Sequence, residues 1–517
     1  MLLDFEKDGV PDREFETCIV GAGAAGLALA HELHERGQDV VLLEGGGASR
    51  WERKSQALKA TETVGHSFVG AQAGRFRALG GTTSFWMGQV LELDEIDFAE
   101  RPWVPGSSWP LEKRDLAPYY KRASQLENTD VFLQEDADIL DEAGIQESGL
   151  GRDLCLSFSR YCPERKFARL FSPLINGDTL PVVLHANVCG GGLAEDRKSV
   201  QSVEFRTMEG RLGTCRARNF VFCLGGIESA RFILNQKHTP WDPSGLAGRF
   251  FTDHIQCFAA EVRNADLSSP DWYLGPQRVS QQYLPKLKLT PEAQREHEVL
   301  NVSGLIEYND GSWSTMRTAV QLLTGSTSGL GMDRVANMAV KLPAVAWSIL
   351  RSKKDPAYHL PWARPHLSVY CEQLPLSDSR ITLTSKQDKT GLYQAAVDWR
   401  IAEPELNTIR KYVEIVSDVF RLNGLGEIIP HKDLYKDTFE EQIIDTFHHC
   451  GTTRMATSSD EGVVDPNLRL FGTDNAYVCS TSVFPTSGFA NPTHTVIALA
   501  ARLADHLNGN HRGMPDA

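Results

Sequence analysis

Residues 17–26 read Thr-Cys-Ile-Val-Gly-Ala-Gly-Ala-Ala-Gly, and this stretch decides the fold of the chain. A short β-prone run leads into the glycines at positions 21, 23 and 26, and an apolar pattern with helical spacing follows them. A second β-prone run over residues 39–43 then ends at Glu44. Strand, glycine turn, helix, strand and acid in this register predict a dinucleotide-binding βαβ unit.

Each glycine has a separate physical role in such a unit. Gly21 makes the tight turn, Gly23 lets the backbone approach a pyrophosphate, and Gly26 lets the helix lie close to the strand. The free N–H groups at the helix N-terminus favour phosphate. Glu44 can accept hydrogen bonds from both ribose hydroxyls and would repel a 2′-phosphate, which disfavours NADP. The unit alone leaves NAD and FAD open.

Composition excludes several classes of function. The chain has 517 residues and a net charge of −14, so it is a poor candidate for binding nucleic acid. Its ten cysteines stand singly without a CxxC pair, and we predict a reduced protein with no metal site. The acidic N-terminus has no apolar signal region, and no apolar run is long enough to span a bilayer. We therefore predict a cytoplasmic protein and disfavour membrane contact.

Four further segments resemble, in order, the blocks of the glucose–methanol–choline (GMC) oxidoreductase family. They are Arg77–Trp86 (Arg-Ala-Leu-Gly-Gly-Thr-Thr-Ser-Phe-Trp), Phe222–Arg231, Phe447–Met455 with its HxxGTxRM pattern, and Val464–Thr493. With the N-terminal unit, the resemblance extends from residue 17 to about residue 508. The pyranose and sterol oxidase branches are the most similar, because they also use a histidine and an asparagine.

The resemblance implies two domains that are interleaved in the sequence. One is an α/β FAD-binding domain of the Rossmann-like, glutathione-reductase type, and the other is an α+β substrate domain with an antiparallel sheet. We expect residues 1–105, 185–255 and 447–517 in the FAD-binding domain, and residues 106–184 and 256–446 in the substrate domain. Residues 313–351 are basic and apolar, so they are a candidate lid, membrane-surface element or docking insert, or else an ordinary helix pair.

The implied activity is FAD-dependent oxidation of a CH–OH group to a carbonyl, on a sugar, glycoside or polyol, by hydride transfer to flavin N5. This reaction needs a base, and histidine suits the task because its usual pKa lies near neutral pH. His448 holds the first position of HxxG, and its neighbour His449 is the rival. Adjacent side chains of an extended stretch point to opposite sides, so only one of the two can face the flavin.

Asn491 is the second catalytic candidate, because its amide can hydrogen-bond the substrate oxygen. The alternative is structural, since Asn before Pro492 is also a good helix start. The resemblance assigns FAD contacts to Gly21, Gly23, Gly26, Glu44, Arg77, Gly81, Thr82, Val188, Ser480, Pro492 and Thr493. For Val188 the alternative is an ordinary strand valine. The helix that begins at Pro492 would place its positive N-terminal end against the flavin.

Other features narrow these expectations. Phe85 stands where the pyranose oxidase branch carries a histidine that binds FAD covalently, so we predict non-covalent FAD. We expect no catalytic role for His494, and an inert packing role for Cys450. Alternative functions are oxidation of a sterol or simple alcohol, a lyase of the same family that retains FAD, and a non-catalytic flavoprotein. Oxygen, a quinone or a redox protein would be the electron acceptor.

Overall fold

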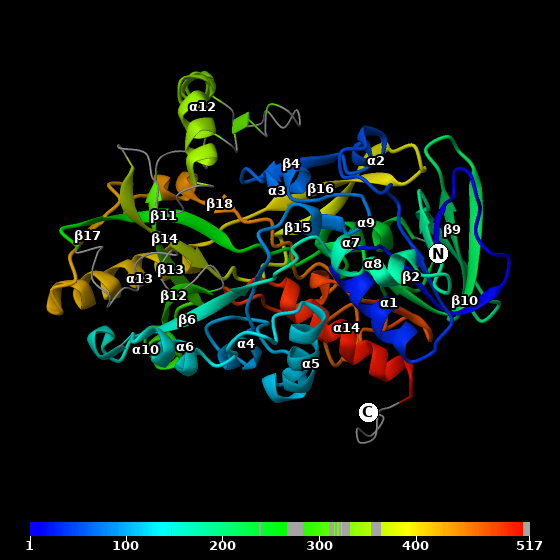
Figure 1. Ribbon diagram of the computed structural model, residues 1–517, viewed down its shortest axis with the longest axis horizontal. Helices are drawn as coiled ribbons and strands as arrows, with labels where there is room; N and C mark the ends of the chain where they lie inside the picture. Colours follow the sequence, from blue (N-terminus) through cyan, green and yellow to red (C-terminus); the bar gives the residue numbers. More distant parts are fainter. Residues whose placement is uncertain are drawn as a thin grey trace.

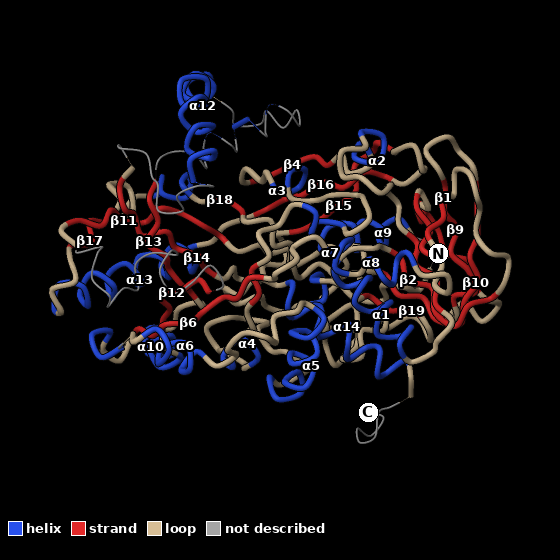
Figure 2. Tube along the Cα trace, in the orientation of Figure 1, coloured by secondary structure: helices blue, strands red, loops and turns tan. Residues whose placement is uncertain are grey.

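The structure is a computed structural model that describes most of the 517 residues. The described residues are 1–145, 147–236, 239–265, 283–309, 331–352 and 363–509, with 315, 318, 319 and 322 as isolated positions. Two large sheets lie at opposite ends of an elongated molecule, and the helix near the C-terminus runs between them (Figure 1). Figure 2 shows that long loops connect the two ends.

The first sheet contains the strand of the glycine motif. In spatial order its strands are β1 (Leu2–Asp4), β7 (Val182–Leu184), β3 (Val40–Leu43), β2 (Glu14–Val20), β10 (Leu212–Phe222), β9 (Val200–Arg206) and β8 (Asn187–Leu193), with β19 (Ala476–Val478) also paired to β10. The pairs from β1 to β10 are parallel, whereas β10, β9 and β8 form an antiparallel meander. β3 is a continuous buried apolar run, as expected for a parallel strand covered on both faces.

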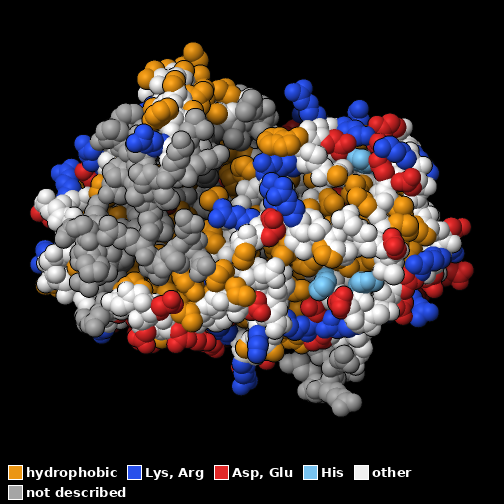
Figure 3. All heavy atoms as spheres, in the orientation of Figure 1, with side chains coloured by type: hydrophobic (Ala, Val, Ile, Leu, Met, Phe, Trp, Pro, Cys, Tyr) orange, Lys and Arg blue, Asp and Glu red, His pale blue; other side chains and the backbone are white. Residues whose placement is uncertain are grey.

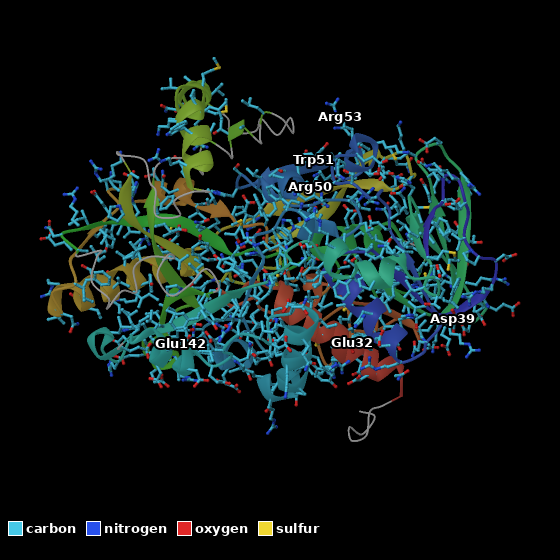
Figure 4. All side chains as sticks on the ribbon, viewed as in Figure 1. Glu32, Asp39, Arg50, Trp51, Arg53 and Glu142 are labelled. Carbon is cyan, nitrogen blue, oxygen red and sulfur yellow. The ribbon has the colours of Figure 1, made fainter. Side chains whose placement is uncertain are left out.

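Helices cover this sheet and join distant parts of the chain. α1 (Ala24–Glu35) packs against α14 (Thr493–Leu507), which in turn packs against α5 (Lys113–Leu126). Glu32, labelled in Figure 4, pairs with Arg122 of α5, and Arg122 also binds Asp505 of α14 at 2.7 Å. These ion pairs tie the glycine-motif helix to the C-terminal helix.

The second sheet is antiparallel. In order its strands are β17 (Glu427–Pro430), β11 (Ile255–Arg263), β14 (Arg364–Cys371), β13 (Val302–Asn309), β12 (Tyr283–Leu289), β6 (Leu154–Tyr161) and β5 (Gln89–Val90), and β18 (Ile444–Asp445) also pairs with β11. α13 (Glu403–Leu422) packs on one face of it, where Tyr412 is fully buried and donates to the carbonyl of Leu287 at 2.7 Å. The opposite face of the sheet is not covered by α13.

A third, smaller sheet has three strands among the described residues. It consists of β15 (Arg380–Gln387), β16 (Tyr393–Trp399) and β4 (Thr61–Gly65), and α9 (Gly225–Asn235) packs against β15 and β16. The remaining short helices are α2 (Arg53–Ala57), α3 (Gly70–Ala73), α4 (Glu95–Phe98), α6 (Asp136–Ala143), α7 (Phe167–Leu170), α8 (Ser172–Asn176), α10 (Pro291–His297) and the 3₁₀ turns η1 (Gly81–Ser84), η2 (Glu147–Leu150), η3 (Asp437–Gln442) and η4 (Thr481–Val483).

The helix α12 (Met332–Ser352) projects from the body beside the second sheet (Figure 1). Several of its apolar side chains are well exposed, with Met332 at 84% and Val340 at 79% exposure, whereas Val345 is buried. Hydrophobic atoms gather on this helix in Figure 3. Most of residues 313–330, in the expected insert, lie outside the described residues, so its role stays a prediction. Among the described residues, none of the helices combines the length and apolar character needed to cross a bilayer.

The predicted fold class is confirmed. A Rossmann-like parallel sheet carries the glycine motif, and a separate antiparallel sheet is built from the intervening stretches of chain. The exact domain boundaries given above stay a prediction. The final helix begins at Thr493, one residue after the predicted start.

Candidate active site

One cavity of about 910 Å³ extends from the glycine turn of the first sheet to the second sheet. Gly21, Gly23 and Glu44 line one end of it. His448 and Asn491 line it together with side chains of β11, β12, β13 and β14. The cavity therefore brings the predicted cofactor-binding motif and the predicted catalytic pair to the same space.

The three glycines of the motif differ in what surrounds them. A Cβ atom at Gly21, where φ is +104°, would lie 2.4 Å from the carbonyl oxygen of Cys223. A Cβ atom at Gly26 would lie 1.9 Å from the carbonyl oxygen of Gly21, so this glycine allows close packing of the helix and lies behind the cavity wall. A Cβ atom at Gly23 would meet nothing within 4 Å and would enter the cavity.

Glu44 is held by the backbone at the end of β3. Its two carboxylate oxygens accept hydrogen bonds from Ala22 N at 2.9 Å and Gly46 N at 2.7 Å. Burial raises the pKa of Glu44, although these two N–H groups favour the charged form. The carboxylate lines the cavity beside the glycine turn, where a ribose attached to a bound pyrophosphate would lie.

The other predicted cofactor contacts share this cavity. Those on its wall are Arg77, Gly81, Thr82, Val188, Ser480, Pro492 and Thr493. A Cβ atom at Gly81 would lie 2.9 Å from the Cα of Gly23, so the two glycine loops approach each other closely. The buried Nε of Arg77 has no hydrogen-bond partner within the described part of the chain. The terminal nitrogens of Arg77 bond to Asn187 and Glu228. A long cavity, a side-chain-free cradle and an unsatisfied Nε–H group together fit a bound FAD.

Helix α14 points its N-terminus at the cavity. Pro492 is the N-cap residue, and Pro492, Thr493 and Val496 line the cavity. The unsatisfied N–H groups of the first turn and the helix dipole present positive charge there. Asn491 is not the N-cap, which is the structural alternative for this residue, and its side-chain amide bonds to Lys286 and His448 instead.

The neighbouring residues His448 and His449 have different surroundings. Phe447 has φ of +71°, a strained conformation for a residue with a side chain, and its ring packs over Gly70 and Gly74. His448 lies against His254 and Asn491. His449 packs between Phe68 and Phe251, with ring centroids 5.4 and 6.1 Å away. Both histidines border the cavity, but only His448 belongs to the polar cluster.

Hydrogen bonds determine which nitrogen of His448 carries a proton. Nε2 of His254 lies 3.3 Å from the carbonyl oxygen of Ser487, which can only accept, so His254 is protonated at Nε2. Burial and the nearby Lys286 ammonium lower the pKa of His254 to about 4, so its Nδ1 has a free lone pair at neutral pH. Nδ1 of His448 lies 2.9 Å from that atom and must donate to it.

The other side of His448 gives the same answer. Lys286 Nζ lies 3.4 Å from one atom of the Asn491 amide, and because an ammonium only donates, that atom is the oxygen. The amide nitrogen of Asn491 then lies 3.3 Å from Nε2 of His448 and donates to it. Two independent chains of donors and acceptors therefore leave His448 protonated at Nδ1, with a lone pair on Nε2 beside Asn491.

Electrostatics keep this imidazole neutral. Burial, His254, Lys286 and His449 together hold the pKa of His448 well below its usual value. The backbone N–H of His448 donates to Asp253 at 2.9 Å, and Thr446 Oγ1, also 2.9 Å from His448 Nδ1, donates to the same carboxyl group. Burial and the neighbouring Asp445 raise the pKa of Asp253 to about 8. The group is thus a fixed, neutral imidazole in a buried site.

The structure also places residues that the sequence did not single out. His254, Lys286 and Glu307 line the cavity near His448. They are isolated polar residues in β-prone runs, and no short motif marks them. Lys286 of β12 and Glu307 of β13 are brought together by the second sheet, and His254 directly precedes β11 of the same sheet.

Two other predicted side chains take no part in this cluster. His494 is buried, bonds Glu127 at 2.6 Å and stacks on Tyr120, and the Glu127 carboxylate raises its pKa. Cys450 is fully buried, and burial raises the pKa of its thiol well above the usual value. A buried thiol of this kind is a poor nucleophile, in line with the packing role expected for it.

The chain is similar to proteins of known families. Residues 375–500 match the family model described as GMC oxidoreductase, and residues 19–60 match the model of an NAD(P)-binding Rossmann-like domain. The chain is 22% identical to the 6'''-hydroxyparomomycin C oxidase of Streptomyces lividus, covering 97% of this chain and 93% of that protein. It is also 22% identical to the paromamine 6'-oxidase of Streptomyces fradiae, covering 96% and 92% respectively.

Solved structures share the fold. Pyridoxine 4-oxidase from Mesorbium loti superposes with a TM-score of 0.58 at 16% identity, covering 96% of this chain and 100% of that one. A formate oxidase variant from Aspergillus oryzae superposes with a TM-score of 0.59 at 17% identity, covering 97% and 99%. At these identities the likeness extends to the fold alone.

Proposed function

Because the chain belongs to the GMC oxidoreductase family, we propose that it is an FAD-dependent enzyme that oxidises a CH–OH group of a sugar, glycoside or polyol to a carbonyl, with His448 as the base. Asn491 holds the substrate oxygen in this scheme. The FAD is bound without a covalent link, and the glycine turn, Glu44 and the N-terminus of α14 hold it.

The chain's own residues account for the movement of the proton. The bound FAD supplies the acceptor for the hydride that leaves the carbinol carbon. Nε2 of His448 accepts the hydroxyl proton, so that the lost proton and hydride together convert the carbinol to a carbonyl. The amide N–H of Asn491 donates to the substrate oxygen as negative charge develops on it. After the proton arrives, the imidazolium shares its Nδ1–H with His254 and Thr446.

The substrate class is supported by two kinds of observation. Relatives matched over nearly the whole chain are named as oxidases of 6'''-hydroxyparomomycin C and of paromamine, and a relative matched over 36% of the chain is named as a 2-methyl-1,2-propanediol dehydrogenase. The cavity wall near His448 carries Gln256, Lys286, Glu307 and Tyr370, which can hydrogen-bond several hydroxyl groups.

One observation carries the proposal. The donor and acceptor pattern through Lys286, Asn491, His448 and His254 leaves a neutral imidazole whose lone pair faces the amide that would hold the alcohol. A general base for an alcohol needs this protonation state at the start of the reaction.

Anaerobic mixing with candidate substrates tests the proposal. The FAD-loaded protein is mixed without oxygen with sugars, glycosides, polyols, sterols and simple alcohols, and the flavin absorbance is followed. We expect a sugar or polyol to bleach the flavin. Turnover of a cyanohydrin with persistent flavin colour would instead identify a lyase and contradict the proposal.

A further inference from the structure

One face of the second sheet forms the wall of the cavity near His448. Alternate residues of a strand share a face, and the residues that line the cavity from this sheet follow this spacing. They are Gln256 and Phe258 of β11, Tyr370 of β14, Leu305 and Glu307 of β13, and Leu284 and Lys286 of β12. Strand register places Gln256 opposite Tyr370, and the Gln256 amide donates to the Tyr370 hydroxyl at 2.8 Å.

Lys286 is an unusual member of this wall. Its side chain is buried, with an exposed fraction of 4%, and its Nζ donates to the Asn491 amide oxygen at 3.4 Å. An ammonium has three N–H donors, and this is its one hydrogen bond among the described residues. Burial lowers the pKa of Lys286 to about 8, so the group is still charged near neutral pH. A buried cation with unused donors indicates a place for a ligand oxygen.

Glu307 provides the matching acceptor. It lies on β13, the strand next to β12. Burial raises the pKa of Glu307, while a hydrogen bond with Ser368 and attraction to Lys286 favour its charged form. No ion pair joins the two among the described side chains, and both line the cavity. The next lysine on the same face differs, because Lys288 is paired with Asp94 at 2.6 Å and does not line the cavity.

We infer that Lys286 and Glu307 form a subsite for the hydroxyl group next to the carbinol that His448 deprotonates. A hydroxyl both accepts and donates hydrogen bonds, so it can accept from the ammonium and donate to the carboxylate at once. The substrate is therefore a compound with adjacent hydroxyl groups, such as a sugar ring or a polyol, rather than a monohydric alcohol. This inference rests on the proposed function, because it takes His448 and Asn491 as the place of reaction.

Two probe substrates that differ by one hydroxyl test the subsite. The kcat/KM values for trans-cyclohexane-1,2-diol and cyclohexanol are compared in the FAD-loaded wild type, in Lys286→Met and in Glu307→Gln. The second hydroxyl of the diol would form hydrogen bonds to charged groups. The wild type should therefore have a kcat/KM about 10- to 100-fold higher for the diol than for cyclohexanol. Each variant should lose most of this preference. The control variant Lys288→Met, which changes the paired lysine outside the cavity, should keep it.

The possible failures are distinct. Equal kcat/KM for the two probes in the wild type, or an unchanged diol preference in Lys286→Met and Glu307→Gln, would overturn the subsite while leaving alcohol oxidation standing. An equal fall for both probes in these variants would show a merely structural role and would also overturn it. If neither these probes nor any other alcohol bleaches the flavin of the wild type, the proposed function fails, and the subsite fails with it.

Discussion

The Nδ1 atoms of His254 and His448 lie 2.9 Å apart and share one proton. Because Nε2 of His254 donates to the carbonyl of Ser487, the shared proton belongs to His448. The His254 side chain thus acts as a positioning residue that turns the lone pair of His448 Nε2 towards Asn491.

Replacing His254 should weaken the base without removing it. His254→Phe keeps a ring of similar size but removes the acceptor for His448 Nδ1, leaving Thr446 as the remaining partner. Loss of one hydrogen bond corresponds to about tenfold slower flavin reduction. Anaerobic stopped-flow measurement at saturating substrate checks this, with the FAD content of the variant as control. A rate equal to that of the wild type would argue against the assigned tautomer.

The two glycines of the helix turn should respond differently to the same change. Gly23→Ala leaves the fold unstrained but places a methyl group in the cavity, so it should weaken FAD binding and leave the melting temperature of the FAD-free protein unchanged. Gly26→Ala forces a Cβ against the Gly21 carbonyl oxygen and should cost about 1–3 kcal/mol of stability or more. Thermal unfolding and FAD titration of both variants check the contrast. Equal FAD affinity in Gly23→Ala and the wild type would contradict the assigned cradle.

The pH dependence of flavin reduction should reflect the lowered pKa of His448. The base acts only when neutral, so the rate should rise with pH through one ionisation that lies below pH 6.5. Removing a nearby cation favours the imidazolium, so in Lys286→Met this rise should move to higher pH. Pre-steady-state rates of flavin reduction, measured between about pH 4 and pH 8, check both points, because histidine titrates in this range. A shift to lower pH in the variant would contradict the account.

The cofactor should be released when the protein unfolds. The loop between Gly80 and Gly88 contains no histidine, and Phe85 in this loop lines the cavity. Acid precipitation of the FAD-loaded protein should leave the yellow colour in the supernatant. Colour that stays with the pellet would show a covalent link.

The sequence predicted those parts of the site whose residues lie close together in a short motif. The glycine turn needs three glycines within six positions, and the pair His448 and Gly451 lies in one short motif, so each could be recognised without a fold. The N-terminus of α14 followed from the apolar run after Pro492, although the structure assigns the N-cap to Pro492 instead of Asn491.

The residues that were missed depend on register. Lys286 of β12 bonds to Asn491, and His254, directly before β11, bonds to His448. These contacts depend on β11 and β12 belonging to one sheet, and the neighbours of the two residues in sequence give no sign of this. The lysines at 286 and 288 look equivalent in sequence, yet only one is paired with a carboxylate. The alternation of side chains along a strand cannot distinguish these two lysines, because both lie on the same face of β12.

The most direct test of the central claim compares the two neighbouring histidines. Flavin reduction by a bleaching substrate is measured anaerobically by stopped flow in His448→Ala and His449→Ala, each loaded with FAD. We predict a rate lower by about 100-fold or more in His448→Ala, the usual size of general-base catalysis, and a rate near that of the wild type in His449→Ala. A large loss in His449→Ala with a normal rate in His448→Ala would contradict the assignment of the base.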